Sequence, residues 1–241
     1  MNLVLNPTEI NQLLDKDRSN LLIVDARPFS DYAKGHIPGA INIELVQFHW
    51  IDTSKTGILE FNRQMKILLS NIGIKKDKFV LFYDDISGAS AARGVWLLLY
   101  FSHNKVAMLD GGFDRWKKEG YEIETKSNAL VHTNFQNRPN RKLLADFKQI
   151  KSAIKKKKKS SSSAVIIVDS RSKSEYDGST VRAARAGHIP SAINIDWNYN
   201  IENNVFKDPT QLEKLYWHIP KDAEVITYCQ GGYRAANSFV A

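Results

Sequence analysis

The sequence contains one cysteine, Cys229, among 241 residues, which excludes a disulfide within the chain. Such sparse use of cysteine is typical of proteins from reducing compartments. Long hydrophobic runs are also missing, since the longest, 95–101, falls far short of the roughly 18 residues that span a membrane. The first residues lack the basic segment and long apolar stretch of a secretory signal. Together these absences predict a cytoplasmic protein with no membrane partner.

Signatures of bound metals, nucleotides and nucleic acids are missing as well. No Cys and His spacing suggests a metal site and no glycine-rich phosphate-binding motif occurs, so we expect neither metal nor cofactor. The net charge of +8 includes five consecutive lysines at 155–159, and without them it falls to +3. Because no aromatic residue interrupts the lysine and serine tract 155–163, we expect a solvated surface loop there. The modest remaining charge is compatible with a small anionic substrate and does not demand a nucleic acid as partner.

The two halves of the chain repeat the same sequence blocks in the same order, about 145 to 152 residues apart. This spacing is far longer than the period of a solenoid protein, so we interpret it as two domains of one fold. The predicted first domain spans 1–126, a polar and aperiodic linker spans 127–139, and the predicted second domain spans 140–241. Three pairs of blocks carry the repeat: 22–27 with 166–171, 35–43 with 187–195, and 79–84 with 224–229.

Short apolar runs alternate with amphipathic stretches along the chain. This alternation predicts an α/β fold in which helices cover both faces of a parallel sheet. Ligands of such sheets bind beyond the carboxyl ends of the strands. The expected strands are 21–24, 79–82, 106–109 and 164–168, and the expected helices are 8–16, 61–72, 90–102, 112–119 and 145–154.

Cys229 lies at the end of an apolar, β-branched run and just before a glycine-rich turn. Because Ala235 begins a helix-like segment, we expect the thiol to face a helix N-terminus and backbone N–H groups, which favour anions. Such an environment favours the thiolate form of cysteine. A lone cysteine is more often a small buried apolar residue, but the turn and Arg234 together indicate a reactive nucleophile.

The blocks 24–27, 35–43, 109–116 and 228–234, with their repeats, resemble the rhodanese family of sulfurtransferases, and more closely its tandem-domain type. The resemblance implies two rhodanese-like domains, each with a parallel five-stranded sheet flanked by helices, and a persulfide on Cys229. Asp84 occupies the cysteine position of the first domain, which is therefore predicted to be non-catalytic. By the repeat, we interpret the second domain as cut short after Cys229, and we expect it to lack an edge strand and a closing helix.

The residue types, together with the resemblance, predict a ping-pong reaction. Cys229 would take the outer sulfur of thiosulfate and pass it to a thiophilic acceptor such as cyanide, thioredoxin or another thiol. The backbone N–H groups of the turn would stabilise the negative charge, and Gly231 and Gly232 would permit positive φ angles and close approach. Arg234 is the candidate to bind the anionic donor, because a guanidinium pairs well with an oxyanion. The remaining predicted substrate-binding residues of the loop are Gln230 and Tyr233.

Arg171 follows the strand that carries Asp169, and two interpretations of it remain open. In related two-domain enzymes an arginine at the matching position helps to bind the donor, while the alternative is an ion pair with Asp169 or Glu175. His36 and His188 belong to a block that both domains share, which indicates a structural role for them.

Three other functions remain as alternatives. A 3-mercaptopyruvate sulfurtransferase would use the same chemistry, although such enzymes usually carry a serine and a threonine in the cysteine loop, and this loop has neither. A persulfide carrier or partner-binding module would deliver its sulfur to another protein. A cysteine phosphatase is a remote alternative, because phosphatases place five residues between Cys and Arg, and here only four separate Cys229 from Arg234.

Overall fold

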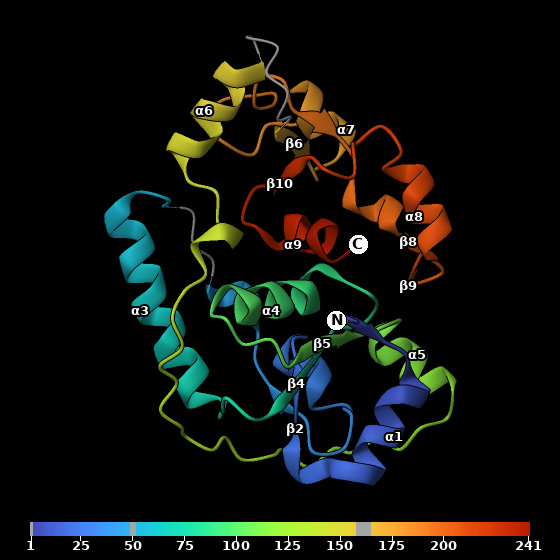
Figure 1. The fold of residues 1–241 in the computed structure, drawn as a ribbon. Helices are drawn as coiled ribbons and strands as arrows, with labels where there is room; N and C mark the ends of the chain where they lie inside the picture. The colour runs from blue at the N-terminus through green and yellow to red at the C-terminus, as the bar shows by residue number, and fades with distance from the viewer. Residues whose placement is uncertain (1, 49–51, 158–164) are drawn as a thin grey trace.

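The computed structural model describes residues 2–48, 52–157 and 165–241, and its first half is built on a five-stranded sheet (Figure 1). Every pairing in this sheet is parallel, as the sequence predicts. The central strands are apolar, β-branched and aromatic, as expected for strands buried on both faces. The strand order is β1 (Val4–Leu5), β5 (Val106–Leu109), β4 (Phe79–Tyr83), β2 (Leu21–Asp25) and β3 (Ile41–Asn42).

Helices cover both faces of this first sheet, because alternate residues of its strands point to opposite sides. Val24, Phe82 and Met108 belong to the core on one face, together with α3 (Lys55–Asn71) and α4 (Ala89–Tyr100). Ile23, Leu81 and Ala107 belong to the core on the other face, with α1 (Pro7–Asp17) and α5 (Gly112–Lys118). The four helices expected in this half are therefore confirmed, and shorter helical segments are α2 (Phe29–Tyr32), η1 (Arg18–Asn20) and η2 (Leu45–Phe48).

The second half repeats the same parallel arrangement with three strands in the described residues. Its order is β10 (Glu224–Tyr228), β6 (Val165–Asp169) and β7 (Ile193–Asn194), which matches β4, β2 and β3 of the first sheet. The counterparts of β1 and β5 do not occur in 165–241, so the full set of five strands is found in the first sheet. The other elements are α6 (Phe147–Lys157), α7 (Lys173–Asp177), α8 (Pro209–Leu215), α9 (Tyr233–Val240), β8 (Ile201–Glu202), β9 (Val205–Phe206), η3 (Arg141–Leu143) and η4 (Trp197–Asn200).

The lysine tract begins within a helix. The expected helix 145–154 runs from Phe147 to Lys157 as α6, so the prediction of a loop is wrong for 155–157. Lysine is a good helix former, which allows the helix to continue past the amphipathic stretch 147–154. The rest of the tract lies outside the described residues. None of the helices within the described ranges is long and apolar enough to cross a membrane.

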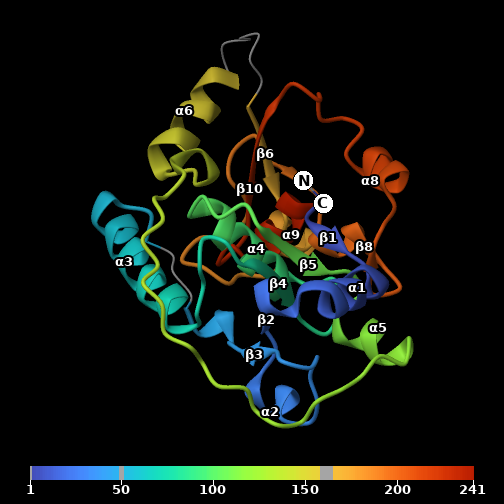
Figure 2. The ribbon, with the colours of Figure 1, turned by 60° about the horizontal axis from the view of Figure 1, so that its bottom comes forward.

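The two halves meet where α4 packs along α9, between the two sheets (Figures 1 and 2). Ala236 of α9 is buried in the same apolar core as α3 and α4, and Tyr233, Phe239 and Val240 pack against that core. Hydrogen bonds cross the contact: Asn237 Nδ2 donates to the Ser87 carbonyl at 2.9 Å. The two halves therefore share a core, and the turns before α4 and α9 come close together.

The stretch 127–139, which we expected to be a linker, contains no helix or strand. It is nevertheless tied to the first half, because Phe135 is buried in its core and Thr133 Oγ1 donates to the Ile74 carbonyl at 2.8 Å. The chain therefore crosses between the halves along a fixed path.

Candidate active site

Cys229 lies in the turn between β10 and α9, which confirms the expected strand-to-helix position. Its Sγ accepts a hydrogen bond of 3.1 Å from the Gly232 N–H, which precedes the first turn of α9. Of the two loop glycines, Gly232 takes the left-handed φ, at +87°, while Gly231 is not among the residues with a positive φ. The helix N-terminus and this N–H both favour a negatively charged sulfur.

A buried network around Asp169 fixes the strand that leads to the cysteine. The Tyr228 hydroxyl donates to Asp169 at 2.6 Å, and Arg171 Nη2 donates to the same carboxylate oxygen at 2.6 Å and to the Gly187 carbonyl at 2.9 Å. The hydrogen bond to Asp169 raises the pKa of Arg171, so the guanidinium stays charged. In the first half, Arg27 makes the same contacts to Asp25.

The presence of the same network in both halves indicates what Arg171 does. The first half has the same arginine and aspartate but no cysteine, so the pair stabilises the fold independently of any reaction. The guanidinium of Arg171 is committed to Asp169, which supports the structural interpretation that the sequence left open. A contribution of Arg171 to donor binding stays a prediction.

Arg234 lies beside the Cys229 thiol, but its guanidinium already forms an ion pair with the Glu175 carboxylate. Its Nη1 and Nη2 donate to the two oxygens of Glu175 at 2.5 and 2.9 Å. These bonds lower the pKa of Glu175 to about 2, and they raise the pKa of Arg234, with a smaller contribution from Cys229. Glu175 balances the charge of Arg234, so the predicted role of Arg234 in binding the donor stays a prediction. Arg182 lies 3.7 Å from the same carboxylate and is exposed, as is Arg185.

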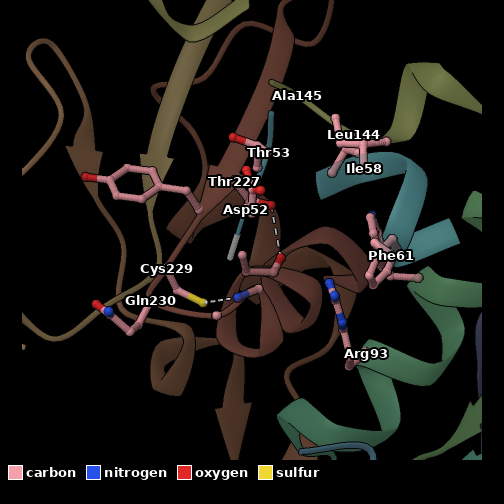
Figure 3. Close-up of a pocket in the computed structure, with 15 residues that line it drawn as sticks. Asp52, Thr53, Ile58, Phe61, Arg93, Leu144, Ala145, Thr227, Cys229 and Gln230 are labelled. Carbon is pink, nitrogen blue, oxygen red and sulfur yellow. Dashed lines mark hydrogen bonds between the residues drawn. The ribbon is translucent and has the colours of Figure 1, made fainter. Parts of the chain in front are cut away.

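A cavity of about 270 Å³ lies in front of the thiol and is lined by both halves of the chain (Figure 3). The second half contributes the cysteine loop, and the exposed side chain of Gln230 lies on its rim. The Tyr233 hydroxyl donates to the Leu45 carbonyl of the first half, which ties the loop across the contact. The apolar lining from the first half and the following segment consists of Ile58, Phe61, Trp96, Leu144 and Ala145.

Arg93 of α4 is a cavity residue that the sequence analysis missed. Its guanidinium lies 4.2 Å from the centre of the Trp96 ring and 5.5 Å from that of the Tyr233 ring. It also lies against the cysteine loop, since a Cβ added to Gly232 would be 2.8 Å from Arg93 Nη1. Among the described residues no carboxylate lies within 4.0 Å of this guanidinium. Burial lowers the pKa of Arg93, while Tyr233 and Cys229 counteract that shift.

The repeat could have pointed to Arg93. Arg93 and Asn237 are both the fifth residue of the helix that follows the cysteine or aspartate turn. Each of these side chains reaches the turn of the other half, because Asn237 bonds to Ser87 and Arg93 lies against Gly232. A comparison of the whole repeat, beyond the turns themselves, would have brought out the arginine.

Asp84 is buried in the first half at the position that matches Cys229. Its carboxylate accepts hydrogen bonds of 3.0 to 3.1 Å from the backbone N–H groups of Gly88, Ser90 and Ala91 at the start of α4. Burial raises the pKa of Asp84 to about 6 despite these donors. The turn of the first half therefore holds an anion at a helix N-terminus as well, but a carboxylate cannot carry a transferable sulfur.

The two repeated histidines make matching contacts, although His36 is buried and His188 is exposed. His36 Nδ1 bonds to the Tyr32 carbonyl and its ring stacks on Tyr32, and His188 makes the same contacts with Tyr176. Because the half without a cysteine has the same arrangement, the structural role expected for both residues fits the geometry. Neither histidine lines the cavity.

The Rhodanese-like domain family matches two stretches of the chain, 6–119 and 138–241. A thiosulfate sulfurtransferase of Pseudomonas aeruginosa is 28% identical over an alignment of 243 positions. This alignment covers 99% of this chain and 86% of the relative. The sulfur carrier protein TtuD of Thermus thermophilus is also 28% identical, over 86% of this chain and 75% of its own.

The solved structure of SseA from Escherichia coli, described as a 3-mercaptopyruvate sulfotransferase, has the same fold. It superposes with a TM-score of 0.82 at 21% identity and covers 100% of this chain and 93% of that one. Both repeated halves thus match one domain family, in the order and with the parallel sheets described above. The chain therefore belongs to the rhodanese family and carries two rhodanese-like domains in tandem.

Proposed function

We propose that this protein is a sulfurtransferase that moves a sulfane sulfur from thiosulfate to a thiophilic acceptor through a persulfide on Cys229. The observation that carries the proposal is the position of the thiol, whose Sγ accepts the Gly232 N–H at the N-terminus of α9 in a cavity between the domains. The name of the Pseudomonas aeruginosa relative, a thiosulfate sulfurtransferase, supports the choice of donor.

The reaction has two half-reactions. The Cys229 thiolate attacks the outer sulfur of thiosulfate, the S–S bond of the donor breaks, and sulfite leaves with the bonding electron pair. The persulfide that forms carries one negative charge, as the thiolate did. The Gly232 N–H and the N-terminus of α9 can stabilise this charge in both forms. An acceptor such as cyanide, thioredoxin or another thiol then takes the outer sulfur and restores the thiolate.

The donor is inferred from the residues of the loop. Gly231, Gly232 and Tyr233 occupy the positions between Gln230 and Arg234, so the loop offers no hydroxyl like those of the serine and threonine in mercaptopyruvate enzymes. A cavity lined by the Arg93 guanidinium suits an inorganic anion. 3-Mercaptopyruvate remains the alternative donor, and the two are distinguished by comparing their rates at equal concentration.

The test of the reaction is thiocyanate formation from thiosulfate and cyanide. Wild-type protein is expected to produce thiocyanate, and Cys229→Ser is expected to produce none above the uncatalysed rate. The wild type should also gain roughly 32 Da, one sulfur atom, after exposure to thiosulfate and lose it again with cyanide. Retained activity in the Cys229→Ser variant would rule out the covalent route.

A role as a persulfide carrier is a second candidate, supported by the similarity to the sulfur carrier protein TtuD. Such a carrier would load sulfur on Cys229 but turn over slowly with cyanide and fast with a protein thiol. Loading followed by parallel assays with cyanide and with reduced thioredoxin separates the two roles. Hydrolysis of an aryl phosphate by the same preparation would instead favour the remote phosphatase alternative.

A further inference from the structure

Three arginines, Arg93, Arg171 and Arg234, are candidates to bind the donor, and two of them are already paired. Arg171 is bound to Asp169 and Arg234 to Glu175, each through more than one hydrogen bond. Arg93 has neither an ion pair nor a hydrogen bond to any other residue in the described part of the chain. A guanidinium that lines a cavity and has no carboxylate partner can pair with an anion that enters the cavity.

The guanidinium of Arg93 is also held in a fixed place. It stacks against Trp96 of its own helix, and the Tyr233 ring of the other domain lies on the same group. It lies against Gly232, the residue whose N–H donates to the Cys229 sulfur, and leaves no room for a Cβ there. Figure 3 shows Arg93 reaching from α4 toward this loop. An anion bound to Arg93 would therefore lie beside the thiol.

We propose that Arg93, supplied by the non-catalytic first domain, binds the anionic sulfur donor in front of Cys229. This inference rests on the proposed function, and it shifts the main counter-charge for the donor from Arg234 to a residue of the other domain. Arg93 would hold the oxygens of the –SO₃ group, the part that leaves as sulfite, while the thiolate forms its bond to the outer sulfur. The guanidinium itself exchanges no electrons or protons.

Binding without reaction is the first test. Thiosulfate is titrated into Cys229→Ser by calorimetry, and the same titration is made with Arg93→Gln and with Arg63→Gln added to that background. Arg63 is the matched control, because it is an exposed arginine of α3 paired with Glu60 and away from the cavity. The Arg93→Gln change is expected to weaken binding by about tenfold or more, and Arg63→Gln by less than about twofold. Equal binding with and without Arg93, or no binding to Cys229→Ser at all, would overturn the proposal.

Steady-state kinetics with the cysteine present give the second test. Arg93→Gln should raise the KM for thiosulfate by about tenfold or more while the KM for cyanide changes little, and Arg93→Lys should recover part of the loss. Arg93→Met is expected to change the unfolding temperature little, because no ion pair is lost and the long apolar side chain can keep the contact with Trp96. Equal losses for both substrates together with a lower unfolding temperature would show a structural role and overturn the inference.

The outcomes for Arg93 and for the proposed function can be told apart. A wild-type protein that forms no thiocyanate and takes up no sulfur would contradict the proposed function, whatever the variants do. An active wild type whose KM for thiosulfate is unchanged by Arg93→Gln would contradict the role of Arg93 and leave the covalent mechanism in place.

Discussion

At the scale of single residues, Asp84 carries a proton over a pH range in which ordinary aspartates do not. Its pKa is raised to about 6 in the folded protein, from an ordinary value of 3.8. Between these two values the folded state binds more protons than the unfolded state, so stability falls as the pH rises from about 4 to about 6 and this contribution is constant above that. Asp84 therefore stabilises the first domain better when it is neutral.

Asp84→Asn should remove this pH dependence. The free energy of unfolding of the wild type is expected to fall, relative to that of the variant, by about 1–3 kcal/mol between pH 4 and pH 6. Urea unfolding at both pH values measures the difference. Asp15→Asn, a change on the exposed surface of α1, is the control and should follow the wild type. Parallel curves for wild type and Asp84→Asn would contradict the assignment.

Glu175 behaves in the opposite way, because Arg234 lowers its pKa to about 2. A lowered folded pKa contributes stability that is present above the unfolded value and is lost as the pH falls toward 2. Glu175→Gln should therefore lower the free energy of unfolding by about 1–3 kcal/mol at pH 7 and by less at pH 3. Chemical unfolding at the two pH values checks this. A loss that is equal at both would mean that the carboxylate charge is not responsible.

At the scale of elements, the turn between β10 and α9 depends on Gly232 for two reasons. The residue has a left-handed φ of +87°, and any Cβ there would collide with Arg93. Gly120 offers a matched control, since its φ is +79° but nothing lies within 4 Å of a Cβ added there. A comparison of the two positions separates backbone strain from the contact with Arg93.

Both Gly232→Ala and Gly120→Ala should lower stability by about 1 kcal/mol or more, because alanine disfavours positive φ. Only Gly232→Ala is expected to lower the rate of sulfur transfer, by about tenfold or more, since it displaces both the N–H at Cys229 and the Arg93 guanidinium. Thermal unfolding and thiocyanate assays measure the two effects. Equal activities for both variants would show that the turn tolerates the shift.

The elements also show what could be predicted from sequence. The turn at Cys229 was predictable because it is local: the apolar strand, the glycines and the helix follow one another along the chain. The first sheet was predictable because its strands are apolar on both faces. Two helix ends could not be predicted, the start of α3 at Lys55 and the end of α6 at Lys157. Helix ends depend on caps and on packing as well as on the apolar pattern.

The place of Arg93 beside the cysteine loop could not be predicted from local patterns along the chain. Cys229 and Gly232 belong to the second domain, and only the packing of α4 on α9 brings them to Arg93. The sequence likewise did not reveal that Glu175 would bind Arg234, since 59 residues separate them. Contacts between distant segments follow from tertiary structure, which periodicity and motifs do not specify.

At the scale of the whole molecule, the shared core predicts that both domains unfold together. Asn237 is fully buried, bonds to the Ser87 carbonyl of the first domain and accepts from Asn200 of the second. Asn237→Ala should lower the unfolding temperature of one cooperative transition, with a loss of about 1–3 kcal/mol from the unpaired groups. Calorimetry checks this, with Asn198→Ala as the control, because the Asn198 side chain is exposed. Two separate transitions would contradict the cooperative unfolding.

The crossed packing of α4 and α9 means that the turn at each cysteine position is completed by a side chain of the other domain. The fifth residue of each helix reaches the turn of the opposite domain, so the guanidinium beside the Cys229 loop comes from the first domain. A thiol introduced into the first turn by Asp84→Cys would have the Asn237 amide on its turn, where Cys229 has the Arg93 guanidinium. A second site of the same composition would thus require changes in both domains, Asp84→Cys in one and Asn237→Arg in the other.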